Sequence, residues 1–61
     1  MTQVTKTQFD ATLAEAGIPS WAEPRREVDV EYTYDCYDNA EGDEIAFISY
    51  RSGVEPTYHV R

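Results

Sequence analysis

The sequence predicts an α+β fold in which one N-terminal helix packs on a three-stranded antiparallel sheet, a meander. Three observations support this prediction: a short helical pattern of apolar residues, a long stretch of strict alternation, and a two-residue turn between the last two apolar stretches. The 61 residues are enough for a single domain, spanning 1–61, with a modest core.

The helix is expected over residues 8–16. Thr7 precedes it as the expected N-cap, and apolar residues then recur on one helical face. Gly17 is expected to adopt the left-handed conformation that ends the helix, so that Ile18 folds back onto Leu13. A helix of about three turns is not stable alone in water, so it is expected to pack on the sheet.

The segments on either side of the helix are expected to be irregular. Residues 1–6 are a loose lead-in. Residues 18–26 connect helix and sheet with at most one helical turn, because Pro24 disfavours helix at the residue before it. Trp21 is expected to lie over the end of the helix as a core side chain rather than to bind a partner.

The first strand is expected over residues 27–36, where apolar and polar residues alternate. One face carries the apolar members Val28, Val30, Tyr32, Tyr34 and Cys36. The other face carries Glu27, Asp29, Glu31, Thr33 and Asp35. Such alternation is typical of an antiparallel sheet with one covered face and one solvent-exposed face.

The second and third strands are expected over residues 44–51 and 54–60, joined by a tight turn at Ser52-Gly53. A two-residue turn sets Arg51 opposite Val54. The pairs that follow from this register on the covered face are Phe47 with Tyr58 and Ile45 with Val60.

Two further expectations concern the last strand and the uncovered face of the sheet. Pro56 lacks a donor for the strand ladder and therefore predicts that the last strand is an edge. Ile48 and Tyr50 fall on the open face. There they are either ordinary exposed apolar residues or part of a contact surface.

The charge distribution is the most informative feature for function. The net charge is −7, from twelve acidic and five basic residues. Eight of the acidic residues lie between Glu27 and Glu44, and no Lys or Arg occurs in that span. Because valines and tyrosines alternate with the acids, the stretch is expected to be folded rather than a disordered acidic tail.

Catalysis and cofactor binding are not expected. His59 is the only histidine and lies on an expected edge strand, and Cys36 lies among carboxylates, which suppress the thiolate. The acidic turn that begins at Asp38 departs from EF-hand spacing, since Ala40 and Gly42 occupy its third and fifth positions. No metal site is therefore predicted. The negative charge also argues against direct binding of nucleic acid.

A cytoplasmic location without membrane association is expected. Cys36 is the only cysteine, so no disulfide can form within one chain. Residues 1–7 lack the basic and apolar regions of a signal peptide, and no apolar stretch approaches the ~18 residues that span a bilayer. The chain is expected to be a monomer.

The acidic residues of the expected first strand and of the turn after it are predicted to form the functional surface. Carboxylates two residues apart on one strand face lie about 6.6–6.8 Å apart. Arginine side chains in a basic groove bind such carboxylates with the bidentate geometry that they use on phosphate. The predicted partner-binding residues are Glu27, Asp29, Glu31, Asp35, Asp38, Glu41, Asp43, Glu44 and Tyr37. A merely solvated acidic face is the alternative.

The pattern Glu27-x-Asp29-x-Glu31-x-x-x-Asp35, followed by the acidic turn, resembles the acidic strand faces of phage-encoded DNA-mimic inhibitors of the anti-CRISPR type. The resemblance covers residues 27–44. It implies a protein that occupies the basic DNA-binding cleft of a bacterial defence complex, such as a CRISPR–Cas effector, and so blocks target DNA binding.

Two other classes of function remain open. A small interaction module, such as an antitoxin or an accessory subunit, would bind a basic partner through the same face without competing with DNA. A small structural protein of a phage or its host would use the sheet edge instead, through Ile48, Tyr50 and the last strand.

Overall fold

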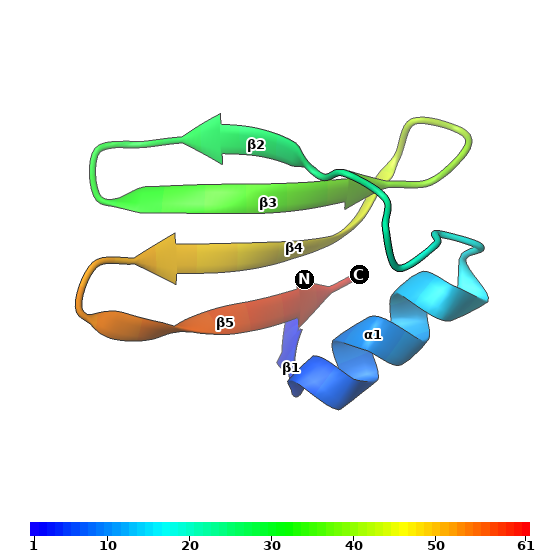
Figure 1. The fold of residues 1–61 in the computed structure, drawn as a ribbon, viewed down its shortest axis with the longest axis horizontal. Helices are drawn as coiled ribbons and strands as arrows, with labels where there is room; N and C mark the ends of the chain where they lie inside the picture. The colour runs from blue at the N-terminus through cyan, green and yellow to red at the C-terminus, as the bar shows by residue number, and fades with distance from the viewer.

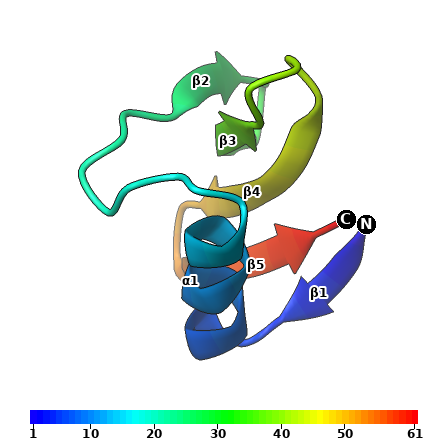
Figure 2. The same ribbon diagram turned by 90° about the vertical axis from the view of Figure 1, so that its right-hand side faces the viewer.

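The computed structural model describes all 61 residues. They form one helix and five strands, joined by turns and loops. In chain order these are β1 (Thr2–Val4), α1 (Lys6–Glu15), β2 (Arg25–Val28), β3 (Tyr32–Asp38), β4 (Glu44–Arg51) and β5 (Val54–Val60). The strands form one antiparallel sheet in the order β1-β5-β4-β3-β2, and α1 lies against one face of it (Figures 1 and 2). The prediction of a three-stranded meander is therefore wrong, and the fold is mostly β with one helix.

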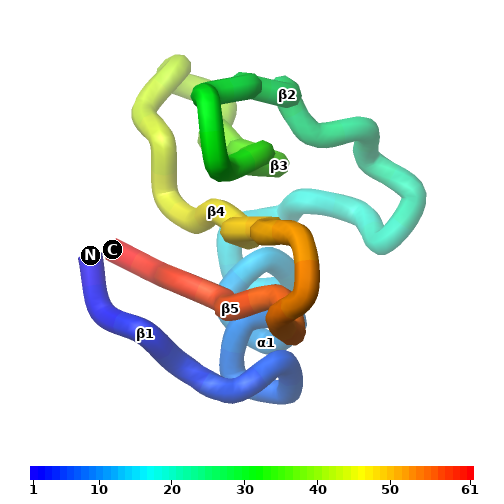
Figure 3. Tube along the Cα trace, turned by 90° about the vertical axis from the view of Figure 1, so that its left-hand side faces the viewer, coloured from blue at the N-terminus to red at the C-terminus, as the bar shows by residue number.

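The first additional strand is β1, at the beginning of the chain. Thr2–Val4 pairs with Tyr58–Val60 of β5, which brings the two chain termini side by side (Figure 3). The last strand is thus not an edge along this part of its length. Pro56, which suggested an edge, lies outside the stretch that β1 pairs, so its missing N–H costs no hydrogen bond there.

The second additional strand arises because the predicted strand 27–36 is broken. Residues 29–31 form a turn, and β2 folds back against β3 with Arg25 opposite Cys36 and Val28 opposite Thr33. The Asp29 N–H donates to the Tyr32 carbonyl (2.8 Å), and the Asp29 carboxylate accepts from the N–H of the next residue (2.7 Å). Such a local bond from an Asp side chain favours a turn over a continuing strand, and strict alternation does not reveal it.

The helix packs on the face that was expected to be open. Phe9 is buried and forms the core with Ile45 and Ala46. The partly buried side chains around this core are Val4, Leu13, Ile18, Tyr37, Ile48, Tyr58 and Val60. Ile48 and Tyr37 therefore belong to the core side of the sheet, and Tyr34 and Phe47, which alternate with them, lie on the other side.

A shift in register between β4 and β5 causes this exchange of faces. Arg51 lies opposite Val54, as expected, but an irregularity follows between Ser49 and Arg51. Beyond it the pairs are Ile48 with Tyr58, Phe47 with His59 and Ala46 with Val60, so the two predicted core pairs are wrong. One unpaired residue in a strand moves every later side chain to the opposite face.

Both helix ends are held by local hydrogen bonds. Thr5, not Thr7, is the N-cap, and it forms a capping box with Gln8: the Gln8 N–H donates to the Thr5 hydroxyl (3.2 Å) and the Thr5 N–H donates to the Gln8 side chain (3.1 Å). At the other end Gly17 adopts a φ of 78°, and the Ile18 N–H donates to the Leu13 carbonyl (2.9 Å). The predicted Schellman ending is confirmed. No helix has the length and apolar character needed to cross a membrane.

Replacement of Thr5 by Ala should destabilise the protein by about 0.5–2 kcal/mol, because it removes the N-cap oxygen. The matched control is Thr7→Ala, which lies inside the helix, where Ala is the better helix former; it should leave stability unchanged or raise it slightly. Urea unfolding followed by circular dichroism measures both. A larger loss for Thr7→Ala than for Thr5→Ala would contradict the assigned helix start.

Candidate protein-interaction surface

The return of β2 brings Arg25 onto the acidic stretch of the chain. Its guanidinium contacts three carboxylates, those of Glu27, Asp38 and Glu44. It binds Asp38 through Nε (3.2 Å) and Nη2 (3.1 Å), and Nη2 also donates to Glu44 (3.1 Å). The hydrogen bonds from Arg25 lower the pKa of Asp38. We call these four residues the Arg25 cluster; three carboxylates and one guanidinium leave it with two net negative charges.

Arg26 pairs with Asp35, which the sequence placed on the exposed acidic face. Arg26 donates from Nε (2.8 Å) and Nη2 (3.1 Å) to the two carboxylate oxygens. Asp35 is only 6% exposed, because it lies on the helix side of β3. The hydrogen bonds from Arg26 lower the pKa of Asp35 below its usual range. Asp35 is therefore a buried structural carboxylate, and the prediction that it contacts a partner is wrong.

The continuous row of carboxylates expected along one strand is not formed. Asp29 and Glu31 lie in the β2–β3 turn, and Glu41 and Asp43 lie in the loop between β3 and β4, at the opposite end of the sheet (Figure 1). Five of the twelve acidic side chains form ion pairs, which leaves seven without one. These seven are all exposed: Glu15, Glu23, Asp29, Glu31, Glu41, Asp43 and Glu55.

Tyr37 belongs to the core rather than to the surface. Its ring meets that of Phe9 edge-on, with 5.8 Å between the ring centroids, and its hydroxyl pKa is raised by burial. Together with Tyr50 and Tyr58 it lines a cavity of about 290 Å³ between α1, the loop after it and the sheet. Tyr37, which was predicted to bind a partner, is therefore partly buried against the core on the helix side of the sheet.

Trp21 is 81% exposed and does not cover the end of the helix. The loop that follows α1 swings away from the sheet before it enters β2 (Figure 2), and Trp21 lies in this loop. Three valines at the other end of the sheet are also exposed: Val28, Val30 and Val54. The prediction that Trp21 is a core side chain, which rested on the usual burial of aromatic residues, is therefore wrong. Exposed Trp side chains are frequent anchors of protein contacts.

The face of the sheet without the helix carries a row of four aromatic rings, here called the aromatic ladder: Tyr32, Tyr34, Phe47 and His59. Tyr32 stacks on Tyr34 (5.9 Å between ring centroids), and Tyr34 meets Phe47 edge-on (5.8 Å). Phe47 stacks on His59 across β4 and β5 (4.5 Å). The rings are half-buried. The sequence contains every member, but only the observed register shows that they adjoin.

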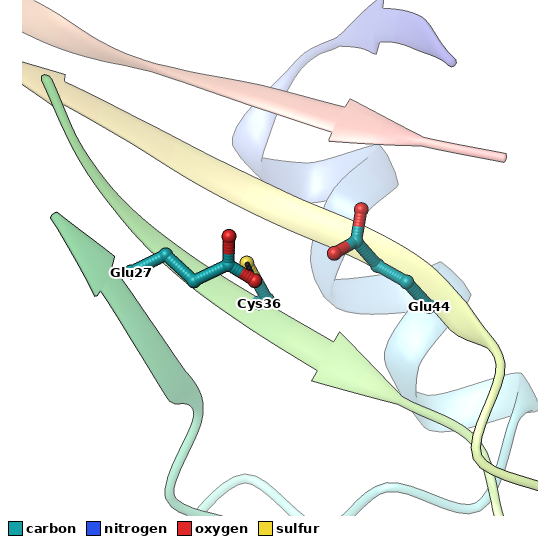
Figure 4. Close-up of side chains that lie close together, drawn as sticks. All are labelled: Glu27, Cys36 and Glu44. Atoms are coloured by element: carbon teal, nitrogen blue, oxygen red, sulfur yellow. Dashed lines mark hydrogen bonds between the residues drawn. The ribbon is translucent and has the colours of Figure 1, made fainter. Parts of the chain in front are cut away.

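Three potential ligand groups adjoin the ladder on the same face. Glu27, Cys36 and Glu44 extend from β2, β3 and β4, and their donor atoms lie within 4.8 Å of one another (Figure 4). Burial, reinforced by Glu44, raises the pKa of the Cys36 thiol, whose Sγ lies 3.9 Å from a Glu27 oxygen. Both carboxylates are paired with Arg25, so a cation already lies beside these groups.

No family model, curated protein or solved structure matches this chain.

Replacement of Asp35 by Asn should destabilise the protein by about 1–3 kcal/mol at neutral pH, because it removes a buried, paired carboxylate. The pKa of this carboxyl is lowered in the folded state. The contribution of the ionised Asp35 carboxylate to the free energy of unfolding is therefore fully present at pH values above its unfolded-state pKa of about 3.9. It is lost as the pH falls through the lower pKa of the folded state. Urea unfolding at a series of pH values should thus show the variant and the parent converging in acid.

The control is Asp43→Asn, which removes the same charge from an exposed, unpaired site and should change stability by less than about 0.5 kcal/mol. Equal effects of the two substitutions, or an Asp35→Asn effect that persists in strong acid, would show that the pair with Arg26 does not stabilise the fold.

Proposed function

We propose that this chain is an acidic binding protein that acts by docking on a positively charged surface of another protein. The observation that carries the proposal is the set of seven exposed carboxylates without an ion pair, on a chain with a net charge of −7. Like charges on a small domain reduce its stability by mutual repulsion. A basic partner relieves that repulsion when it binds, so the surface charge favours association.

The sign of the surface selects the class of partner. Nucleic acids and anionic membranes repel a chain of this charge, whereas basic proteins attract it over several ångströms before contact. Only Arg51 and Arg61 among the five basic residues lie outside ion pairs. A small interaction module, such as an antitoxin or an accessory subunit, fits these properties, and we propose that it acts in the cytoplasm.

A DNA-mimic inhibitor of a bacterial defence complex, of the anti-CRISPR type, is the second candidate. The pairs Asp29 and Glu31, and Glu41 and Asp43, favour it, since each offers two exposed carboxylates that form no ion pair. The break in the carboxylate row removes the regular, phosphate-like spacing along one strand, and for this reason the candidate stands second.

Capture of a partner from a bacterial lysate by the tagged protein tests both candidates. We expect a basic protein, identified by mass spectrometry, whose capture falls steeply as salt is raised, because the attraction is electrostatic. The variant with Asp29→Asn, Glu31→Gln, Glu41→Gln and Asp43→Asn should associate about tenfold more slowly. Release of the partner by added DNA would favour the inhibitor; retention in its presence would favour the module.

The control for this experiment is the Lys6→Gln and Asp10→Asn double variant, which removes an exposed ion pair without changing the net charge. Its capture should equal that of the parent. Capture that survives high salt, or that the fourfold variant retains in full, would contradict the proposal.

A further inference from the structure

Two shallow hollows open on the helix-free face of the sheet, beside the aromatic ladder. One, of about 280 Å³, is lined by Glu27, Tyr34, Cys36, Glu44 and Phe47 and is called the Glu27–Glu44 hollow. The other, of about 300 Å³, is lined by Tyr32, Ser49, Arg51, Val54, Glu55 and Thr57. No residue of α1 lines either hollow.

We infer that the Glu27–Glu44 hollow receives an arginine side chain from a basic segment of the partner, and that the helix-free face is the docking surface. This inference rests on the proposed function and adds to it the surface and the chemistry of contact. The occupant is a guanidinium because the hollow combines two carboxylates with two aromatic rings, and a guanidinium binds both kinds of group.

The charge of the hollow complements that occupant. Glu27 and Glu44 belong to the Arg25 cluster, in which one guanidinium faces three carboxylates. The cluster therefore keeps two negative charges after its internal pairing. A second guanidinium that enters beside Tyr34 and Phe47 can share these carboxylates and lie against the one ring face that the ladder contacts leave open, since aromatic ring faces attract cations.

The chain itself contains one contact of this type at the neighbouring hollow. The guanidinium carbon of Arg51 lies 5.5 Å from the centroid of the Tyr32 ring, and Arg51 Nη1 lies 3.4 Å from the Tyr32 hydroxyl. Tyr32 stacks in turn on Tyr34, which borders the Glu27–Glu44 hollow. One end of the ladder thus already holds an arginine, and the hollow offers the same ring chemistry with two carboxylates added.

Other occupants fit less well. A second copy of the chain would bring a charge of −7 against a charge of −7. Nucleic-acid bases stack on aromatic side chains, but such surfaces pair the rings with basic residues that neutralise the phosphates, and here the flanking residues are acidic. A basic protein segment is the occupant for which both the rings and the charges are favourable.

Titration of the ¹⁵N-labelled protein with a short polyarginine peptide tests the inference by NMR. We expect the largest shift changes at the hollow and the ladder. We expect about tenfold weaker binding by the Glu27→Gln and Glu44→Gln double variant, because it loses the charge pairing with the peptide. We expect a similar loss for Tyr34→Leu, because it removes a cation–π contact. The charge-matched control is the Glu41→Gln and Asp43→Asn double variant, which should change the affinity by no more than about twofold.

The outcomes separate the inference from the proposed function. If both double variants weaken binding equally, or the shift changes fall elsewhere, the docking surface is wrong, whereas the proposal of an acidic binding protein survives. If the parent does not bind the peptide at all, both fail. Circular dichroism melts show whether each variant is folded, and Tyr34→Leu, which leaves every ion pair of the Arg25 cluster in place, tests the site when the double variant does not fold.

Discussion

The turn at residues 29–31 is the constraint on which the charge distribution of this protein depends. It ends β2, reverses the chain and returns two arginines to the acidic stretch that follows. Without the turn, residues 27–36 would be one strand with a solvent-exposed row of acids and no cation near it. With it, Arg25 and Arg26 neutralise four of the acids between Glu27 and Glu44, and the unpaired ones are divided between the two ends of the sheet.

The same return of β2 allows Asp35 to lie on the face of the sheet that the helix covers. Placing Asp35 on the helix side would be prohibitive if the carboxylate were alone, since burial of an unpaired charge costs several kcal/mol. Its bidentate pair with Arg26 removes that obstacle. The core side chains of β3 and β4 can then meet Phe9, while the alternating positions form the aromatic ladder on the opposite face.

The sequence was sufficient for features with strong local signals. The bounds of β4 and β5, the turn between them and the Gly17 ending of the helix were predicted correctly, because each depends on a few adjacent residues. The sequence was insufficient where a strand pairs with a segment far away in the chain, or where one irregular residue sets the register of a strand pair. The pairing of β1 needs β5, the irregularity near Ser49 reverses the faces, and the break after Val28 depends on a side-chain hydrogen bond. Of the predicted contact residues, Glu27 and Glu44 lie at the proposed docking surface, whereas Asp35 and Tyr37 are packed within the fold.

The charge distribution and the two faces of the sheet depend on the return of β2 onto β3, which a NOESY spectrum of the protein in solution can detect. We expect cross-strand contacts of Arg25 with Cys36 and of Val28 with Thr33, together with the turn at residues 29–31. A spectrum without these contacts, in which residues 27–36 form one uninterrupted strand, would show that β2 does not fold back onto β3. It would also restore the exposed carboxylate row, and with it the DNA-mimic inhibitor as the favoured function.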